Sequence, residues 1–304
     1  MHLYGVCMKH ILARLILILS VICAFPTVRA SADVFKLGIL HGNLDIFNYE
    51  ISVVRLALDH AGREHELVVI PLPDVTQERI LKFLEFGDVI NVFFSGYSKD
   101  RESTFLQVDI PLTRGLLGHR VFIRKANAPS LSNVQTIDQL KSYKIGSGIG
   151  WPDTDIFEAA GFNVVKATYG NLWPMLDKQR YDLFNRGINE AATEIRQQKR
   201  KGYKFEVDEN VLVSYPYDYF LYLNKNSTRL HQILTKGLQK AFDNGSFQKN
   251  FLSHPNIKKA LSQFPLKDMA VFKLNNPFIS DRIRQIPNSY WYHIDAPDDG
   301  VASE

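Results

Sequence analysis

Short, mostly apolar runs alternate with segments in which apolar residues recur every three or four positions between residues 35 and 94. Runs of this length predict strands, and the three-to-four spacing predicts amphipathic helices. We expect strands at 35–40, 67–70 and 90–94, and helices at 51–61 and 80–84. Alternating strands and helices favour an α/β layer around a mostly parallel sheet.

The same alternation returns beyond a Pro/Ser/Asn loop at 127–133. Thr136 and Gln139 have the spacing of a capping box, which predicts the start of a helix. Pro174 is expected in the first turn of a later helix, where proline is tolerated. This second unit has predicted strands at 144–146, 162–167, 181–184 and 211–215, and predicted helices at 172–176 and 189–200.

An aromatic and apolar run at 217–223 precedes a long amphipathic helix at 230–242. The chain is expected to pass twice between the two units, near 122–126 and near 214–218, so that one lobe is inserted into the other. The expected domains are 1–32 as a signal peptide, 33–122 as the first part of lobe 1, 123–216 as lobe 2, 217–295 as the return to lobe 1 with the C-terminal helices, and 296–304 as a flexible acidic tail.

The first 32 residues have the pattern of a secretory signal peptide. Lys9 and Arg14 precede an apolar run from 15 to 25, and small residues then allow cleavage after Ala30 or Ala32. The alternative is a membrane anchor, for which this run is too short. Cleavage leaves 33 basic and 32 acidic residues, a net charge of +1, and removes both cysteines. We therefore expect a protein without disulfides in a bacterial periplasm.

Residues 146–157, GSGIGWPDTDIF, place glycine at alternate positions before a predicted helix. The run matches neither the dinucleotide fingerprint nor the P-loop, because it lacks the G-x-G-x-x-G spacing and a G-K-[ST] sequence. Two interpretations remain open. The glycines can simply turn the chain from strand to helix, which the local sequence favours. Alternatively, free N–H groups near Asp153 or Thr154 can bind an anion or a polar ligand.

Sequence motifs for catalysis or metal binding are few, and the one short match, S-x-x-K at Ser246 to Lys249, is interpreted as surface. The chain contains no G-x-S-x-G and no H-E-x-x-H, and its histidines lie at no metal-ligand spacing. The basic run at 196–204 ends a helix, where cations suit the helix dipole, so we interpret it as solvated surface. We expect no metal, no cofactor and no nucleic-acid partner.

Four arginines lie near the two predicted crossings: Arg101, Arg114, Arg120 and Arg186. Arginine holds carboxylates through a bidentate fork, so these residues are candidates for binding an anionic ligand. The alternative for each of them is an ordinary surface ion pair.

The order of several weak motifs resembles the bacterial extracellular solute-binding proteins of family 3, the periplasmic receptors of polar amino-acid ABC transporters. The motifs are Gly87-Asp88-Val89, Ser98 to Glu102, Asp109 to Leu112, Val121 to Lys125, Thr136 to Leu140, Lys144 to Gly150, Gln179 to Asp182 and Leu234 to Phe247. The likeness extends over residues 35–251. It implies a type II periplasmic-binding-protein fold, in which two discontinuous α/β lobes, joined by two hinge strands, close on a ligand.

The resemblance also implies site residues. Arg101 matches the arginine that grips the α-carboxylate of an amino acid. Gly150 and Trp151 match the glycine and its neighbour, whose backbone N–H joins in. The family has an aromatic residue after its first strand, for which Phe47 or Tyr49 is a possible substitute here.

One departure concerns the acid that holds the α-ammonium of the ligand in the family. Arg186 occupies or crowds that place in this chain, and Glu190 is an approximate replacement. An extra cation at the amine end suits a more acidic ligand, or indicates that transport binding has been lost.

We predict a monomeric periplasmic solute-binding protein, not an enzyme, that closes on a small polar or anionic amino-acid-like ligand and serves an ABC permease. Arg101 and Arg186 would hold charge, Trp151 would pack against the ligand, and Glu190 would orient a polar group. Two alternatives stay open. One is an enzyme on the same scaffold, similar to cyclohexadienyl dehydratase, with Glu190 or Asp155 as its acid. The other is a sensory or interaction module without a role in transport.

Overall fold

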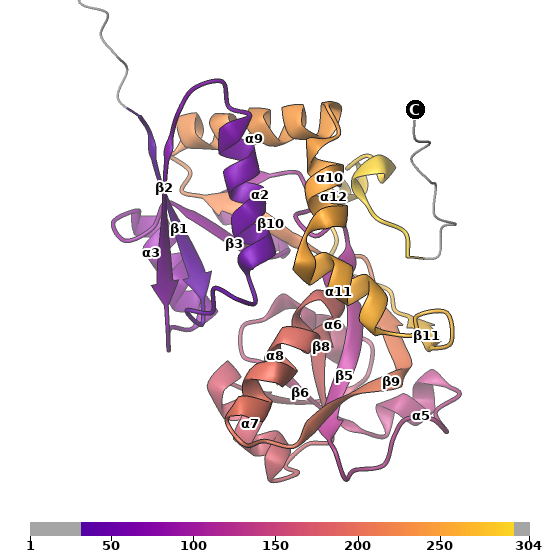
Figure 1. The fold of residues 1–304 in the computed structure, drawn as a ribbon. Coiled ribbons are helices and arrows are strands. Elements are labelled where there is room, and N and C mark those ends of the chain that lie inside the picture. Colours follow the sequence, from indigo (N-terminus) through magenta and orange to yellow (C-terminus); the bar gives the residue numbers. More distant parts are fainter. Residues whose placement is uncertain (1–31, 295–304) are drawn as a thin grey trace, which may run out of the picture. The chain divides into compact units, whose positions relative to one another are not determined.

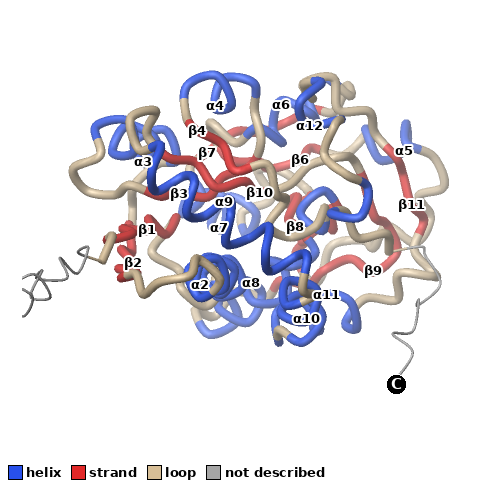
Figure 2. The backbone as a smooth tube through the Cα atoms, turned by 90° about the horizontal axis from the view of Figure 1, so that it is seen from above, coloured by secondary structure: helices blue, strands red, loops and turns tan. Residues whose placement is uncertain are grey.

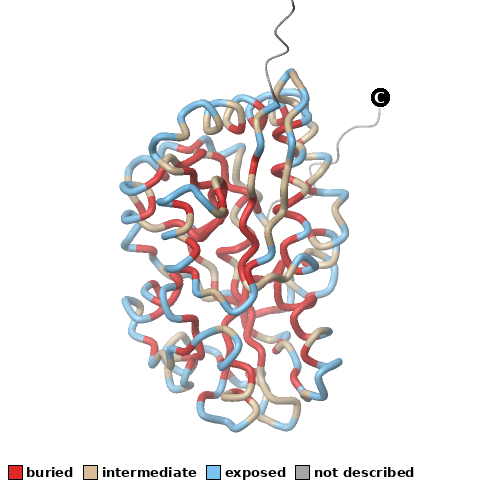
Figure 3. The backbone as a smooth tube through the Cα atoms, turned by 90° about the vertical axis from the view of Figure 1, so that its left-hand side faces the viewer, coloured by how far each residue is buried: buried red, intermediate tan, exposed pale blue. Residues whose placement is uncertain are grey.

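The computed structural model describes residues 32–294, which form two α/β lobes (Figure 1). Apart from Ala32, the predicted signal peptide lies outside these residues, and so does the predicted acidic tail. None of the helices within 32–294 combines the length and the apolar character needed to cross a membrane. Buried segments run along the strands of both lobes, and exposed residues lie mainly on the outer helices and loops (Figure 3).

Lobe 1 is built on a five-stranded sheet with the order β2-β1-β3-β10-β4. The strands are β1 (Val34–Leu40), β2 (Glu66–Leu72), β3 (Val92–Gly96), β4 (Leu106–Val108) and β10 (Tyr219–Leu223). β1 is parallel to both its neighbours, whereas β10 is antiparallel to β3 and β4. Its helices are α2 (Asn48–Asp59), α3 (Gln77–Phe86), α4 (Lys99–Thr104), α9 (Thr228–Asp243) and α10 (Ser246–Ser253).

Lobe 2 is built on a six-stranded sheet with the order β11-β9-β5-β8-β6-β7. The strands are β5 (His119–Lys125), β6 (Lys144–Gly148), β7 (Asn163–Ala167), β8 (Leu183–Gly187), β9 (Phe205–Ser214) and β11 (Ala270–Lys273). Its helices are α5 (Ile137–Lys141), α6 (Pro152–Ala159), α7 (Tyr169–Asp177) and α8 (Ile188–Arg200). The capping box at Thr136 is confirmed. The placement of Pro174 in a first turn is wrong, because α7 begins after Thr168 and Pro174 lies inside it.

Both lobes have the same topology. Without β11, the second sheet has the order β7-β6-β8-β5-β9, which repeats the order β2-β1-β3-β10-β4 of the first sheet. In each sheet three parallel strands are followed by one antiparallel strand that enters from the other lobe, β10 in lobe 1 and β5 in lobe 2. The ends of the parallel strands in each lobe therefore carry the loops that can form a site between the lobes.

The chain leaves lobe 1 earlier than the sequence indicates. β5 pairs with β8 and β9 from His119 and Arg120 onward, so the first crossing lies at 109–118 rather than at 122–126. The second crossing lies between Ser214 and Tyr219, as predicted.

The two crossings are hydrogen-bonded to each other. The Asp218 carboxylate accepts the backbone N–H of Thr113 at 3.0 Å and that of Gly115, and the Tyr215 N–H donates to the Gly118 carbonyl at 3.0 Å. A Cβ on Gly118 would clash with the Tyr215 carbonyl oxygen, so the close approach requires glycine. Any hinge motion therefore moves both crossings together.

Beyond α10 the chain crosses between the lobes again. α11 (Pro255–Gln263) packs against α8, and β11 then extends the sheet of lobe 2 as a parallel neighbour of β9 (Figure 2). Residues 274–294, which include α12 (Asp281–Arg284), return to lobe 1, where the Tyr292 N–H donates to the Arg114 carbonyl at 2.7 Å. We call residues 264–294 the C-terminal strap. The assignment of 217–295 to lobe 1 thus fails for β11.

Candidate functional site

Loops from both lobes meet at a small cavity of about 20 Å³. A cavity of this size holds one water molecule. Its wall contains Phe47, Gly96 and Tyr219 from lobe 1, and Trp151, Asp153, Arg186 and Glu190 from lobe 2. Of the predicted site residues of lobe 2, Trp151, Arg186 and Glu190 are therefore brought together on the wall, and Gly150 is the residue before Trp151.

Arg101 lies in α4, beside the wall of this cavity, and its guanidinium is buried. Nη1 donates to Ser95 Oγ at 2.8 Å and to the Gly96 carbonyl at 2.6 Å, and Nη2 donates to Gln77 Oε1 at 2.6 Å and to the Gly150 carbonyl at 3.0 Å. All four acceptors are neutral, and no carboxylate of residues 32–294 lies within ion-pair distance. Burial lowers the pKa of Arg101. A buried cation with neutral partners favours a nearby anion.

Gly150 and Trp151 form the turn between β6 and α6. Gly150 has φ of 74°, in the left-handed region that favours glycine, and its carbonyl accepts the bond from Arg101. The Trp151 N–H, which the resemblance assigns to the ligand, donates to the Gly148 carbonyl at 3.2 Å. The loop is thus a tight strand-to-helix turn that contacts lobe 1 through a carbonyl oxygen.

Arg186, on β8, is held by two carboxylates and lies close to three rings. Its Nε and Nη2 donate to Glu194 at 2.7 and 2.8 Å, and Nη2 lies 2.9 Å from Glu190 Oε2. The distances from the guanidinium carbon to the ring centroids are 4.8 Å for Trp151, 5.3 Å for Phe184 and 5.7 Å for Tyr169. Burial alone would lower the pKa of Arg186, but the charges of Glu190 and Glu194 raise it. We call Trp151, Tyr169, Phe184, Glu190 and Glu194 the Arg186 cage.

Glu190 uses both of its carboxylate oxygens within the protein. Oε2 accepts the Gly187 N–H at 3.1 Å as well as the bond from Arg186, and Oε1 accepts the Tyr219 hydroxyl at 2.7 Å. Burial would raise the pKa of Glu190, but the guanidinium of Arg186 lowers it. Glu190 is therefore an ionised acceptor whose oxygens are both bound within the protein. Asp155, the other proposed acid, is exposed on α6.

Arg120 forms a buried ion pair that the sequence did not reveal. Its Nη2 lies 2.7 Å from Asp153 Oδ2, and its Nε donates to Asn185 Oδ1 at 2.6 Å. Burial would lower the pKa of Arg120, but Asp153 raises it. Arg120 and Arg186 are thus neutralised within lobe 2, unlike Arg101.

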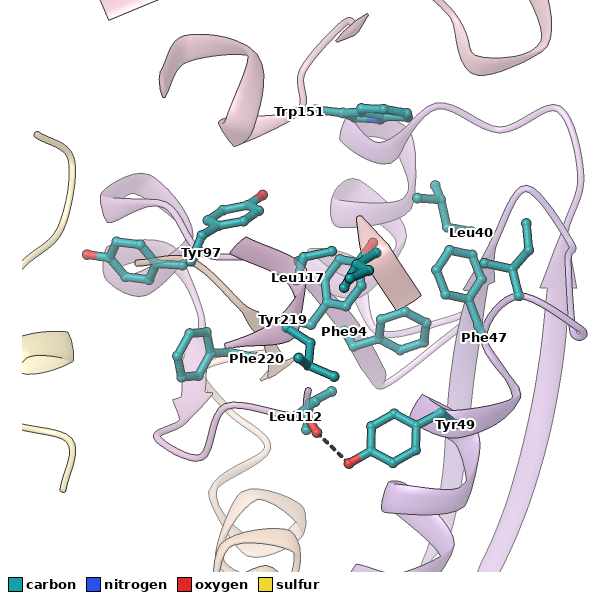
Figure 4. Close-up of a cluster of buried hydrophobic side chains, with 14 of the residues drawn as sticks. Leu40, Phe47, Tyr49, Phe94, Tyr97, Leu112, Leu117, Trp151, Tyr219 and Phe220 are labelled. Carbon is teal, nitrogen blue, oxygen red and sulfur yellow. Dashed lines mark hydrogen bonds between the residues drawn. The ribbon is translucent and has the colours of Figure 1, made fainter. Parts of the chain in front are cut away.

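Tyr49 and Arg114 do not reach the cavity. The Tyr49 hydroxyl donates to the Leu112 carbonyl at 2.8 Å inside lobe 1, whereas Phe47 points toward Phe94 and lines the cavity (Figure 4). The Arg114 side chain donates to carbonyl groups of the C-terminal strap.

The sequence assigned no role to four side chains that shape the site: His41, Asp153, Tyr169 and Glu194. It indicated a role for Asp153 only through its backbone N–H. The His41 ring stacks on Tyr169 across the lobes, with centroids 4.0 Å apart, and burial, followed by the charge of Arg186, lowers the pKa of His41 to about 3. Glu194 could have been found, because it lies four residues after Glu190 on the same face of a helix. Within residues 32–294, no cluster of His, Cys, Asp or Glu is placed to hold a metal ion.

Two lobes of identical strand order, with paired crossings and polar side chains gathered between them, define a type II periplasmic-binding-protein fold. An ancestral arginine-binding protein bound to glutamine has a TM-score of 0.56 and 16% identity over 74% of this chain and 99% of that chain. An arginine third transport system periplasmic binding protein from Legionella pneumophila has a TM-score of 0.55 and 15% identity, over 73% and 98%.

A histidine kinase sensor domain with similarity to periplasmic binding proteins also matches, with a TM-score of 0.53 and 12% identity over 73% of this chain and 96% of that chain. No protein-family model and no curated protein matches the sequence. The predicted fold class is therefore confirmed by structures of low sequence identity.

Proposed function

We propose that this chain is an exported, monomeric solute-binding protein that closes its lobes on a small, amino-acid-like carboxylate and serves an inner-membrane ABC permease. The observation that carries the proposal is the buried guanidinium of Arg101, which has four neutral acceptors and no carboxylate partner among the described residues. The signal-peptide pattern supports export. The transport proteins among the structures of the same fold support the link to a permease.

The position of Arg101 suits ligand-driven closure. Its guanidinium belongs to lobe 1, yet one of its bonds goes to the Gly150 carbonyl of lobe 2. A carboxylate that entered between the lobes would replace neutral acceptors of Arg101 with an ionised acceptor, and arginine–carboxylate pairs are short and frequently bidentate. Such a ligand stabilises the closed arrangement and raises the melting temperature.

A thermal-shift screen of amino acids and small carboxylates with the mature protein tests this proposal. At least one carboxylate should raise Tm saturably, and Arg101→Ala and Arg101→Lys should abolish or reduce that shift. Arg282→Ala is the matched control, because this arginine forms an exposed ion pair with Asp109. A screen without any stabilising carboxylate, or an unchanged shift in a folded Arg101→Ala protein, would contradict the proposal.

A second candidate is a sensory or interaction module, which one observation favours. Arg120, Arg186, Glu190 and Asp153 already pair with one another, and the cavity between them has a volume of only about 20 Å³. Native mass spectrometry of protein purified from its host distinguishes the two candidates, because a solute-binding protein should retain a small molecule of defined mass.

A further inference from the structure

We infer that the side chain of Arg186 occupies a position at which lobe 2 would otherwise bind a cation of the ligand. Of the small, amino-acid-like carboxylates, the cleft then accepts those without an ammonium or guanidinium group. The inference rests on the proposed function for the carboxylate, and it specifies the class of that ligand. Arg186 is then a specificity-determining residue.

The Arg186 cage has the chemistry of a cation site. Rings whose faces lie near a guanidinium attract its charge, most strongly when water is excluded. Glu194 supplies the bidentate carboxylate that matches a guanidinium in shape, with bonds of 2.7 and 2.8 Å. Arg186 is only 4% exposed, so it is enclosed rather than resting on a surface.

The cage lies at the interface between the lobes and not in the core of lobe 2. Trp151, Arg186 and Glu190 line the cavity. Lobe 1 completes the enclosure, because His41 stacks on Tyr169 and the Tyr219 hydroxyl binds Glu190. A ligand in the cleft would therefore meet the cage with its cation position already filled.

Each acidic side chain on the cavity wall already has an arginine partner. Both oxygens of Glu190 accept bonds from the protein, and Asp153 is paired with Arg120 and Asn185. Arg101 forms no ion pair with a carboxylate of residues 32–294, although the charge of Asp153 acts on it at longer range. Arg101 is therefore the charged group that can bind a ligand, and it favours an anion.

Removal of the Arg186 side chain should convert the cage into a binding site for an added cation. Methylguanidinium at millimolar concentration, compared with the same concentration of sodium chloride, should raise the Tm of Arg186→Ala saturably, by about 2–4 °C. The wild-type protein should show no such rise. Arg124→Ala is the matched control, because Arg124 is also paired with a fully buried carboxylate, that of Asp208, and no ring of residues 32–294 lies over its guanidinium. This variant should not respond.

Arg186→Ala leaves two buried carboxylates without their cation, so Arg186→Ala/Glu194→Gln serves as a second variant that removes one of them. A second arm uses only the wild-type protein, which should be stabilised by carboxylates without an amine and not by arginine, lysine or agmatine. Stabilisation of the wild type by those cations, or no response of the folded Arg186 variants to methylguanidinium, would overturn the inference. If no carboxylate stabilises the wild type, the proposed function fails instead, whatever the Arg186 variants do.

Discussion

The Tyr219 hydroxyl of lobe 1 donates a hydrogen bond to Glu190 Oε1 of lobe 2, with 2.7 Å between the two oxygens. Both side chains are buried, at 8% and 2% exposure. The other oxygen of Glu190 binds Arg186 and the Gly187 N–H. The bond from Tyr219 therefore gives each oxygen of this carboxylate of the Arg186 cage a partner. This hydrogen bond thus connects lobe 1 with lobe 2 and, through Glu190, with Arg186.

We expect Tyr219→Phe to lower the free energy of unfolding by about 1–3 kcal/mol, since a buried, ionised acceptor loses a donor. Urea unfolding followed by fluorescence measures the loss. Tyr222→Phe on the same strand is the control, because the Tyr222 hydroxyl is buried without a hydrogen-bond partner among the described residues. That substitution should be neutral or slightly stabilising. An equal loss in both variants would attribute the effect to packing rather than to the bond between the lobes.

Glu50 makes the stability of the protein depend on pH. It is buried in α2, and burial, together with the nearby Glu190 and Asp218, raises its pKa to about 8 from an ordinary value of 4.5. The folded state therefore binds a proton that the unfolded state releases between these values. This contribution is complete below about pH 4.5 and is lost as pH rises to about 8.

Glu50→Gln should flatten the fall in stability between pH 5 and pH 8 and stabilise the protein at pH 8 by a few kcal/mol relative to wild type. A smaller slope should remain, because burial also raises the pKa of Asp218, to about 7. Urea unfolding at a series of pH values provides the measurement, with the exposed Glu66→Gln as the control. A slope identical to that of wild type would show that Glu50 is ionised in the folded state.

Hydrophobic periodicity was sufficient to predict most of the central strands and the major helices, because each of these elements buries a continuous apolar face. It placed the first crossing too late, since the polar His119 and Arg120 belong to β5 and pair with lobe 2. β11 was missed because it is a short edge strand with alternating exposure. The shared strand order of the two lobes depends on pairing between distant segments, which the sequence pattern does not contain.

The sequence identified the arginines of the site by residue type but could not assign their partners. Arg120 pairs with Asp153, 33 positions away in the sequence. Arg186, near the end of β8, pairs with Glu194 of the following helix α8. Arg101, in contrast, donates to neutral acceptors. Which arginines pair with a carboxylate and which bind only neutral acceptors is a property of three-dimensional packing.

Arg114 fastens the C-terminal strap to the first crossing, and its loss should loosen the strap. The side chain, which is 7% exposed, donates to the Ser289 carbonyl at 2.7 Å and to the Tyr290 carbonyl at 3.3 Å. We expect Arg114→Ala to lower the free energy of unfolding by about 1.5–3 kcal/mol, because hydrogen bonds from a charged donor are lost. It should also speed hydrogen exchange in residues 289–292.

Arg282→Ala is the control, because it removes an ion pair with 41% exposure. It should lower the free energy of unfolding by less than about 0.5 kcal/mol. Equal costs, or unchanged exchange in Arg114→Ala, would mean that the strap is held by its other contacts.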